Sequence, residues 1–117
     1  MPTIRDLVRT IRERQGIEAA IVLGRDGLPI DGQTGPALDA DALSAHIPAV
    51  LEAARELGTV SSRGAVGTVV VEYDQGFATI SALSADAVLL VLLRPDAQLG
   101  ELLFELRRHR EHIARLV

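Results

Sequence analysis

The sequence predicts an α+β fold in which one sheet of five strands carries helices on both of its faces. The first observation is the run Ala87–Leu93, because an apolar run without alternation is typical of a strand buried on both faces. Asp86 precedes the run and Arg94-Pro95 closes it, and it is far shorter than the roughly 20 apolar residues of a membrane span. We expect a central strand with apolar elements above and below it. A buried helical segment is the alternative.

The second observation is the order of the elements, which is helix, two strands, helix, three strands and helix. The 117 residues suit one domain, 1–117, with a single core. Apolar residues make up 48% of the chain but aromatic residues only 3%, so Val, Ile, Leu and Ala must fill that core.

Composition excludes several classes of function. All 12 basic residues are arginine, so there is no Walker-type phosphate loop, which needs a lysine. The chain has no cysteine, and therefore no disulfide, thiol nucleophile or thiolate metal site. A net charge of −4 argues against binding to nucleic acid. The N-terminal residues are charged and lack the apolar core of a signal peptide. We expect a cytoplasmic protein with no nucleic-acid or membrane partner.

The first helix is predicted over Thr3–Gln15. Thr3 is its N-cap, and Asp6 completes a variant of the capping box three residues later. Gly16 supplies the stop. The apolar residues of this segment recur at helical spacing on one stripe. They are Ile4, Leu7, Val8 and Ile11.

A β-hairpin follows the first helix. Its strands are predicted at Glu18–Gly24 and Leu28–Asp31. The sequence Arg25-Asp26-Gly27 lies between them, and Asp-Gly favours a two-residue turn because both residues tolerate positive φ. Pro29 removes one backbone donor, so the second strand is expected at an edge of the sheet.

The second helix is predicted over Leu38–Leu57, with Asp39 or Asp41 as its cap. Pro48 lacks an N–H for the carbonyl of Ser44, and we expect a kink there rather than two helices. One apolar stripe consists of Leu43, Ile47, Val50, Ala54 and Leu57. Beside it runs a row of alanines, Ala42, Ala45, Ala49 and Ala53, which either allows close approach of another helix or reflects helix propensity alone.

The last part of the chain reads as a meander and a helix. The strands are Thr68–Tyr73, Phe77–Ser81 and Ala87–Leu93, and Asp96 is expected to cap the helix after them. Phe104 falls opposite the apolar stripe of this helix, so it is either exposed to a partner or covered by the first helix. The stripe consists of Leu99, Leu102, Leu103, Leu106 and Ile113.

The strand Thr68–Tyr73 predicts a homodimer. It begins a meander, so it should lie at an edge, and it lacks the lysines, prolines or inward charges that protect solitary edges. A second copy could cover it by antiparallel main-chain bonds, and a two-fold axis there would bring the alanine rows together. The predicted interface is Thr68, Val69, Val70, Val71, Glu72, Tyr73, Ala42, Ala45, Ala49 and Ala53.

No catalytic set is predicted, and we expect no enzyme activity, cofactor or metal. Ser61 and Ser62 lie in a loop without a Gly-x-Ser-x-Gly pattern or an evident base. Arg25 and Arg63 could stabilise a transferring phosphate, but ordinary surface arginine is the simpler interpretation. Glu105, His109 and His112 have a helical spacing that could place three potential metal ligands near one face. The simpler interpretation is that these histidines lie at the margin of the apolar stripe of the last helix.

The chain resembles the Roadblock/dynein light chain family, whose bacterial members include the gliding-motility regulator MglB. The resemblance rests on Gly16–Leu23, Asp26-Gly-Leu-Pro-Ile, the Ala-rich helix from Asp41, the turn between Tyr73 and Ser81, and the strand and helix on either side of Pro95. It implies a five-stranded antiparallel sheet with the middle helix on one face and the terminal helices on the other. It also implies dimers joined by the edge strand after the middle helix and by that helix.

The function follows from this resemblance and from the lack of a catalytic set. Many family members bind Ras-like GTPases, and some accelerate GTP hydrolysis without giving an arginine finger. We expect a homodimeric interaction module that binds and regulates a Ras-like small GTPase, as MglB-like proteins do. The alternatives are a structural adaptor of the dynein light chain type that ignores nucleotide state, and an enzyme or small-molecule sensor.

Overall fold

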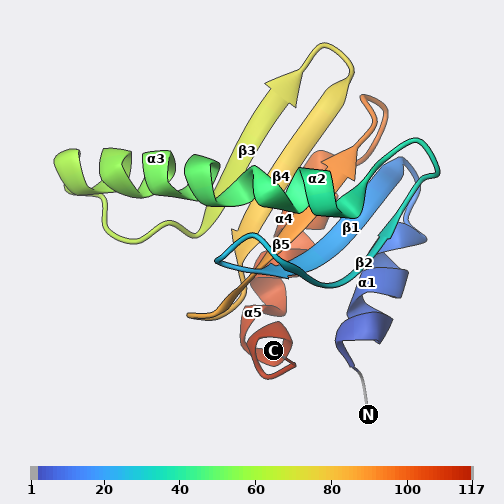
Figure 1. Cartoon of the computed structure of the whole chain (residues 1–117), viewed down its shortest axis with the longest axis horizontal. Helices are drawn as coiled ribbons and strands as arrows, with labels where there is room; N and C mark the ends of the chain where they lie inside the picture. Colours follow the sequence, from blue (N-terminus) through green and yellow to red (C-terminus); the bar gives the residue numbers. More distant parts are fainter. Residues whose placement is uncertain (1–2, 117) are drawn as a thin grey trace.

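Five strands form one antiparallel sheet in the computed structural model, which describes residues 3–116 (Figure 1). They are β1 (Ile17–Gly24), β2 (Pro29–Thr34), β3 (Thr68–Tyr73), β4 (Gly76–Ala82) and β5 (Ala87–Leu93). Their order across the sheet is β2-β1-β5-β4-β3, and every neighbouring pair is antiparallel. The predicted α+β class and sheet are therefore confirmed. Met1, Pro2 and Val117, the ends of the predicted domain, lie outside the described residues.

Helices cover both faces of this sheet. They are α1 (Ile4–Arg12), α2 (Ala40–Ala45), α3 (Ile47–Val60), α4 (Leu99–Arg108) and α5 (Arg110–Ala114). One apolar cluster joins α1, α4 and α5 to the sheet, and a second cluster joins α2 and α3 to the opposite face. This is the division that the family resemblance implies. No helix within residues 3–116 is both long enough and apolar enough to cross a membrane.

The strand β5 lies at the centre of the sheet, as predicted, and the helical alternative is wrong. Its side chains alternate between the two clusters. Leu89 and Val91 belong to the cluster under α1 and α4, whereas Val88 and Leu90 belong to the cluster under α2 and α3. Neighbouring strands and helices on both faces explain why this strand tolerates no polar residue.

The β1–β2 hairpin differs from the predicted two-residue turn. The Gly24 N–H donates to the Leu28 carbonyl (2.9 Å), which leaves a three-residue loop. Gly27 has φ +88°, but Asp26 does not adopt positive φ, so a type I turn followed by a left-handed glycine replaces the expected turn. Pro29 is the first residue of the edge strand β2, as expected for proline.

The middle helical segment is divided into α2 and α3, so the predicted single kinked helix is wrong. His46 separates them while keeping right-handed helical angles, and the two helices continue in nearly the same direction (Figure 1). Pro48 lies in the first turn of α3, where its missing N–H costs no helical bond. Gly27 packs against this break, since a Cβ there would lie 3.1 Å from Pro48 Cγ and 3.2 Å from the Ser44 carbonyl.

The predicted capping box of α1 is present. Asp6 N–H donates to Thr3 Oγ1, and Thr3 N–H donates to Asp6 Oδ2. These bonds, with a smaller contribution from Arg9, lower the pKa of the Asp6 carboxyl. The helix ends at Arg12 rather than at Gln15, because Glu13 caps it and the Arg12 guanidinium turns to the Ile17 carbonyl (2.8 Å). Asp39, one of the two predicted candidates, caps α2.

The last helix departs from its prediction in two respects. Gln98, not Asp96, is its N-cap, and the Asp96 carboxylate instead faces the Arg94 guanidinium at 3.6 Å. A break at His109 then separates α4 from α5. The Phe104 side chain is 60% exposed, so of the two possibilities the exposed one is correct.

Candidate interaction surface

The strand β3 is an edge of the sheet, as predicted. Within residues 3–116 it pairs only with β4, in the register Val70↔Thr79 and Val71↔Ala78. Val69 packs in the cluster under α3. Val70 is 43% exposed and Tyr73 is 60% exposed. One side of β3 therefore offers free backbone groups flanked by exposed apolar side chains.

The C-terminal half of α3 extends beyond this edge (Figure 1). Ile47 and Val50 pack on the sheet, but Leu57 is 67% exposed and Val60 is 80% exposed. Leu57 continues the apolar stripe of the sequence, but it is exposed because no strand lies beneath the helix at that distance. Sequence periodicity shows which side of a helix is apolar, but the width of the sheet decides how much of that side is covered.

The predicted alanine row lies on the outside of α2 and α3. Ala42, Ala45, Ala49 and Ala53 are all exposed. Their methyl groups leave a surface without long side chains, where another helix could approach closely. The dimer interface itself stays a prediction.

A hollow of about 400 Å³ connects α3 with β3. Leu57 and Ala54 line it from the helix, and Thr68 and Val69 line it from the strand. The loop between them folds back onto the helix, since a Cβ at Gly58 of α3 would lie 2.8 Å from the carbonyl oxygen of Gly64 in the loop. The apolar surfaces of the helix and of the edge strand are thus continuous.

Of the residues considered for chemistry, Ser61 and Arg25 have structural roles. Ser61 caps the end of α3, with its hydroxyl donating to the Leu57 carbonyl (2.6 Å). Ser62 has φ +57°, as the chain leaves the helix. The Arg25 guanidinium donates to the Ser84 carbonyl (2.9 Å) and so ties the β1–β2 loop to the β4–β5 loop. Arg63 is exposed in the loop after α3.

The three residues with ligand spacing do not gather into a metal site. His109 Nε2 lies 3.4 Å from Glu105 Oε2, which is an ion pair when the imidazole is protonated. Within the described residues no group of three or more His, Asp or Glu side chains is arranged to hold a metal ion. Near the alanine row, Arg55 hydrogen-bonds to Glu52 (2.9 Å), and this bond lowers the pKa of the Glu52 carboxyl.

Comparison with known proteins identifies the family. The family model of the Roadblock/LC7 domain matches residues 3–93. The chain belongs to the Roadblock/LC7 domain family. The match covers α1 through β5 and therefore includes both parts of the candidate interaction surface. An uncharacterized protein of Methanocaldococcus jannaschii is 26% identical over 103 residues, which are 88% of this chain and 90% of that protein.

Solved structures share this Roadblock/LC7 fold. The Roadblock/LC7 domain from Streptomyces avermitilis has a TM-score of 0.82 and 23% identity, covering 96% of this chain and 95% of that chain. Myxococcus xanthus MglB has a TM-score of 0.86 and 11% identity, covering 97% of this chain and 93% of that chain. At such low identity these similarities establish the architecture, including an MglB-like one.

Proposed function

We propose that this Roadblock/LC7 domain is a cytoplasmic, non-enzymatic module that forms a homodimer and, as a dimer, binds and regulates a Ras-like small GTPase. The observation that carries the proposal is the unpaired β3 edge, which is continuous with the exposed end of α3 through the hollow at Leu57 and Val69. Unpaired apolar edges promote aggregation unless another chain covers them. A second copy is the simplest cover, because a two-fold interface uses the same surface twice.

The proposed dimer joins two β3 strands in antiparallel register, which continues the sheet from one protomer into the next. The overhanging end of each α3 then projects over the partner's side of the junction. Leu57 and Val60 would lose their exposure there, and the alanine rows would face each other across the axis. Burial of apolar side chains of this size is favourable by about 1.5–3 kcal/mol each when complete.

The GTPase part of the proposal rests on family membership and on the similarity to MglB. Regulation would act through selective binding, because a partner that binds one nucleotide state better shifts the GTPase toward that state. Arg25 is committed to the Ser84 carbonyl, so an arginine finger from that residue would first have to break this bond. We favour regulation by binding, although Arg63, which is exposed in the loop after α3, stays available to a partner.

A pull-down of Ras-like GTPases from the same genome tests this function. Each GTPase is loaded with GDP or with a non-hydrolysable GTP analogue, and bound protein is quantified for both forms. We expect at least a tenfold preference for one nucleotide form of one GTPase, which corresponds to about 1.4 kcal/mol. Equal binding of both forms would instead support a nucleotide-independent adaptor of the dynein light chain type, and absence of binding to every GTPase would refute the proposal.

A further inference from the structure

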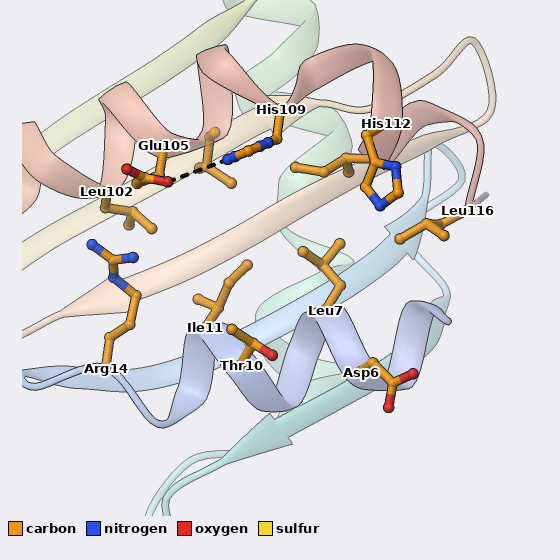
Figure 2. Close-up of a pocket in the computed structure, with 12 residues that line it drawn as sticks. Asp6, Leu7, Thr10, Ile11, Arg14, Leu102, Glu105, His109, His112 and Leu116 are labelled. Carbon is orange, nitrogen blue, oxygen red and sulfur yellow. Dashed lines mark ion pairs between the residues drawn. The ribbon is translucent and has the colours of Figure 1, made fainter. Parts of the chain in front are cut away.

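A second apolar groove lies on the opposite face of the sheet, between α1 and the α4–α5 pair (Figure 2). Its volume is about 310 Å³. Leu7 and Ile11 point into it from α1, and Leu102 and Leu116 point into it from the other side (Figure 2). Leu106 and Ile113 also line it. Ile11, Leu102 and Ile113 form its buried floor, whereas Leu7, Leu106 and Leu116 are partly exposed. This wall consists of two helices, α4 and α5, which meet at the break at His109.

The charged groups at the edge of this groove are mostly engaged with each other. Asp6 points away from the opposite helix and binds Thr3 and Arg9 (Figure 2). Glu105 faces His109 at 3.4 Å. Arg14 lies 3.4 Å from the carboxylate of Glu101. Because most charged side chains at the edge pair with a neighbour, the centre of the groove is apolar.

An arginine cluster adjoins the groove at the α4–α5 break. Four arginines and one acidic residue, Glu111, line a hollow of about 480 Å³, which shares His109 and His112 with the apolar groove. The arginines are Arg107, Arg108, Arg110 and Arg115. The segment 107–115 holds four of the chain's 12 arginines but only one of its 16 acidic residues. Within residues 3–116 none of these four arginines has a carboxylate within 4.0 Å. A chain of net charge −4 therefore carries a local positive patch beside an apolar groove.

We propose that this groove and arginine cluster together bind an acidic amphipathic helix of a partner protein. Two parallel walls of helix with an apolar floor suit the docking of a helix by its apolar face. Asp or Glu residues on one side of that helix would meet the arginines, which bind carboxylates in bidentate geometry. A membrane surface fits less well, because its insertion requires apolar side chains that project, whereas these side chains line a hollow.

The site lies on the face that carries α1, α4 and α5, whereas the candidate dimer surface consists of β3 and the face that carries α2 and α3. The apolar groove therefore lies apart from the dimer surface, although the Arg110 guanidinium lies beside Gly67, which precedes β3. This inference goes beyond the GTPase proposal and does not depend on it. A Roadblock/LC7 dimer with two such grooves would link its partner to a second protein.

Fluorescence anisotropy with three labelled peptides tests the inference. The first peptide is a helix of about three to four turns with Leu at helical spacing and Glu on the remaining positions. The second is a scrambled sequence of the same composition, and the third has Lys in place of every Glu. We expect the acidic amphipathic peptide to bind at least tenfold more tightly than the scrambled peptide, and the Lys peptide not to bind.

Matched variants locate the binding. Arg108→Glu/Arg115→Glu should weaken binding of the acidic amphipathic peptide at least tenfold, whereas Arg63→Glu/Arg94→Glu, which changes the net charge equally, should leave it within twofold. Thr10→Trp, at the exposed edge of the groove, should also weaken it, with circular dichroism confirming that the variant is folded. Equal binding of the acidic and scrambled peptides, or unchanged binding in Arg108→Glu/Arg115→Glu, would overturn the inference. Binding to vesicles of anionic lipid without binding to the peptide would also overturn it.

Discussion

Replacing Gly76 by alanine should lower the free energy of unfolding by about 3 kcal/mol or more. Gly76 begins β4 with φ +137°, which is a backbone conformation that other residues rarely adopt. A Cβ at this position would also overlap the backbone carbonyl oxygen of Leu93 at the end of the central strand. Neither the turn nor β5 can move without breaking the pairing of β4. Chemical denaturation followed by circular dichroism measures the loss.

Two other glycines separate the causes of this effect. Gly64 has φ +87° but open space around its Cβ position, so Gly64→Ala should cost only the conformational strain, about 1 kcal/mol. Gly100 lies in α4 without positive φ and without a close neighbour, so Gly100→Ala should stabilise the protein by about 0.5–1 kcal/mol. If Gly76→Ala lowers the free energy of unfolding no more than Gly64→Ala does, contact with the Leu93 carbonyl does not contribute to the loss.

Ala49→Glu should weaken the proposed homodimer at least 100-fold, or by about 2.7 kcal/mol. Ala49 is exposed on the outer face of α3, so a glutamate there leaves the protomer folded. In the proposed dimer each glutamate would lie against the partner's α3, where its carboxylate loses water without gaining a partner. Sedimentation at several concentrations gives the dissociation constant, and circular dichroism monitors the fold.

Ala85→Glu is the matched control for this substitution. Ala85 is also exposed, in the turn between β4 and β5, and the same added charge there should leave association unchanged. If Ala49→Glu and Ala85→Glu dimerise alike, the alanine row is not part of the interface. The β3 contribution to the interface would then need its own test.

Patterns that reflect burial predicted most of the fold. The unbroken apolar run Ala87–Leu93 predicted the central strand with its observed bounds, and the valines of Thr68–Tyr73 predicted an edge strand with its observed bounds. Pro29 predicted the other edge. In each case a local chemical property, such as apolar character on both faces or a missing N–H, has only one suitable position in a sheet.

Features that depend on distant parts of the chain could not be predicted in this way. The overhang of Leu57 depends on the width of the sheet below α3, and the unused cap at Asp96 depends on where the chain leaves β5 to reach α4. The groove between α1 and α4–α5 depends on the distance between two helices that are far apart in sequence. The sequence shows that arginines are frequent in residues 107–115, but it does not show that an apolar groove lies beside them.

Single cysteines along β3 test the central claim most directly, because the chain has no cysteine of its own. In an antiparallel pair of identical strands, a two-fold axis normal to the sheet places one residue opposite its own copy, with Cα atoms about 4.5–5.5 Å apart. That spacing allows a disulfide. Each position from Thr68 to Tyr73 is replaced in turn, and Gln33→Cys on the other edge, β2, is the control. We expect rapid oxidation to a covalent dimer at one β3 position and none at Gln33→Cys. A covalent dimer at no β3 position, or one that forms equally well through β2, would contradict the account.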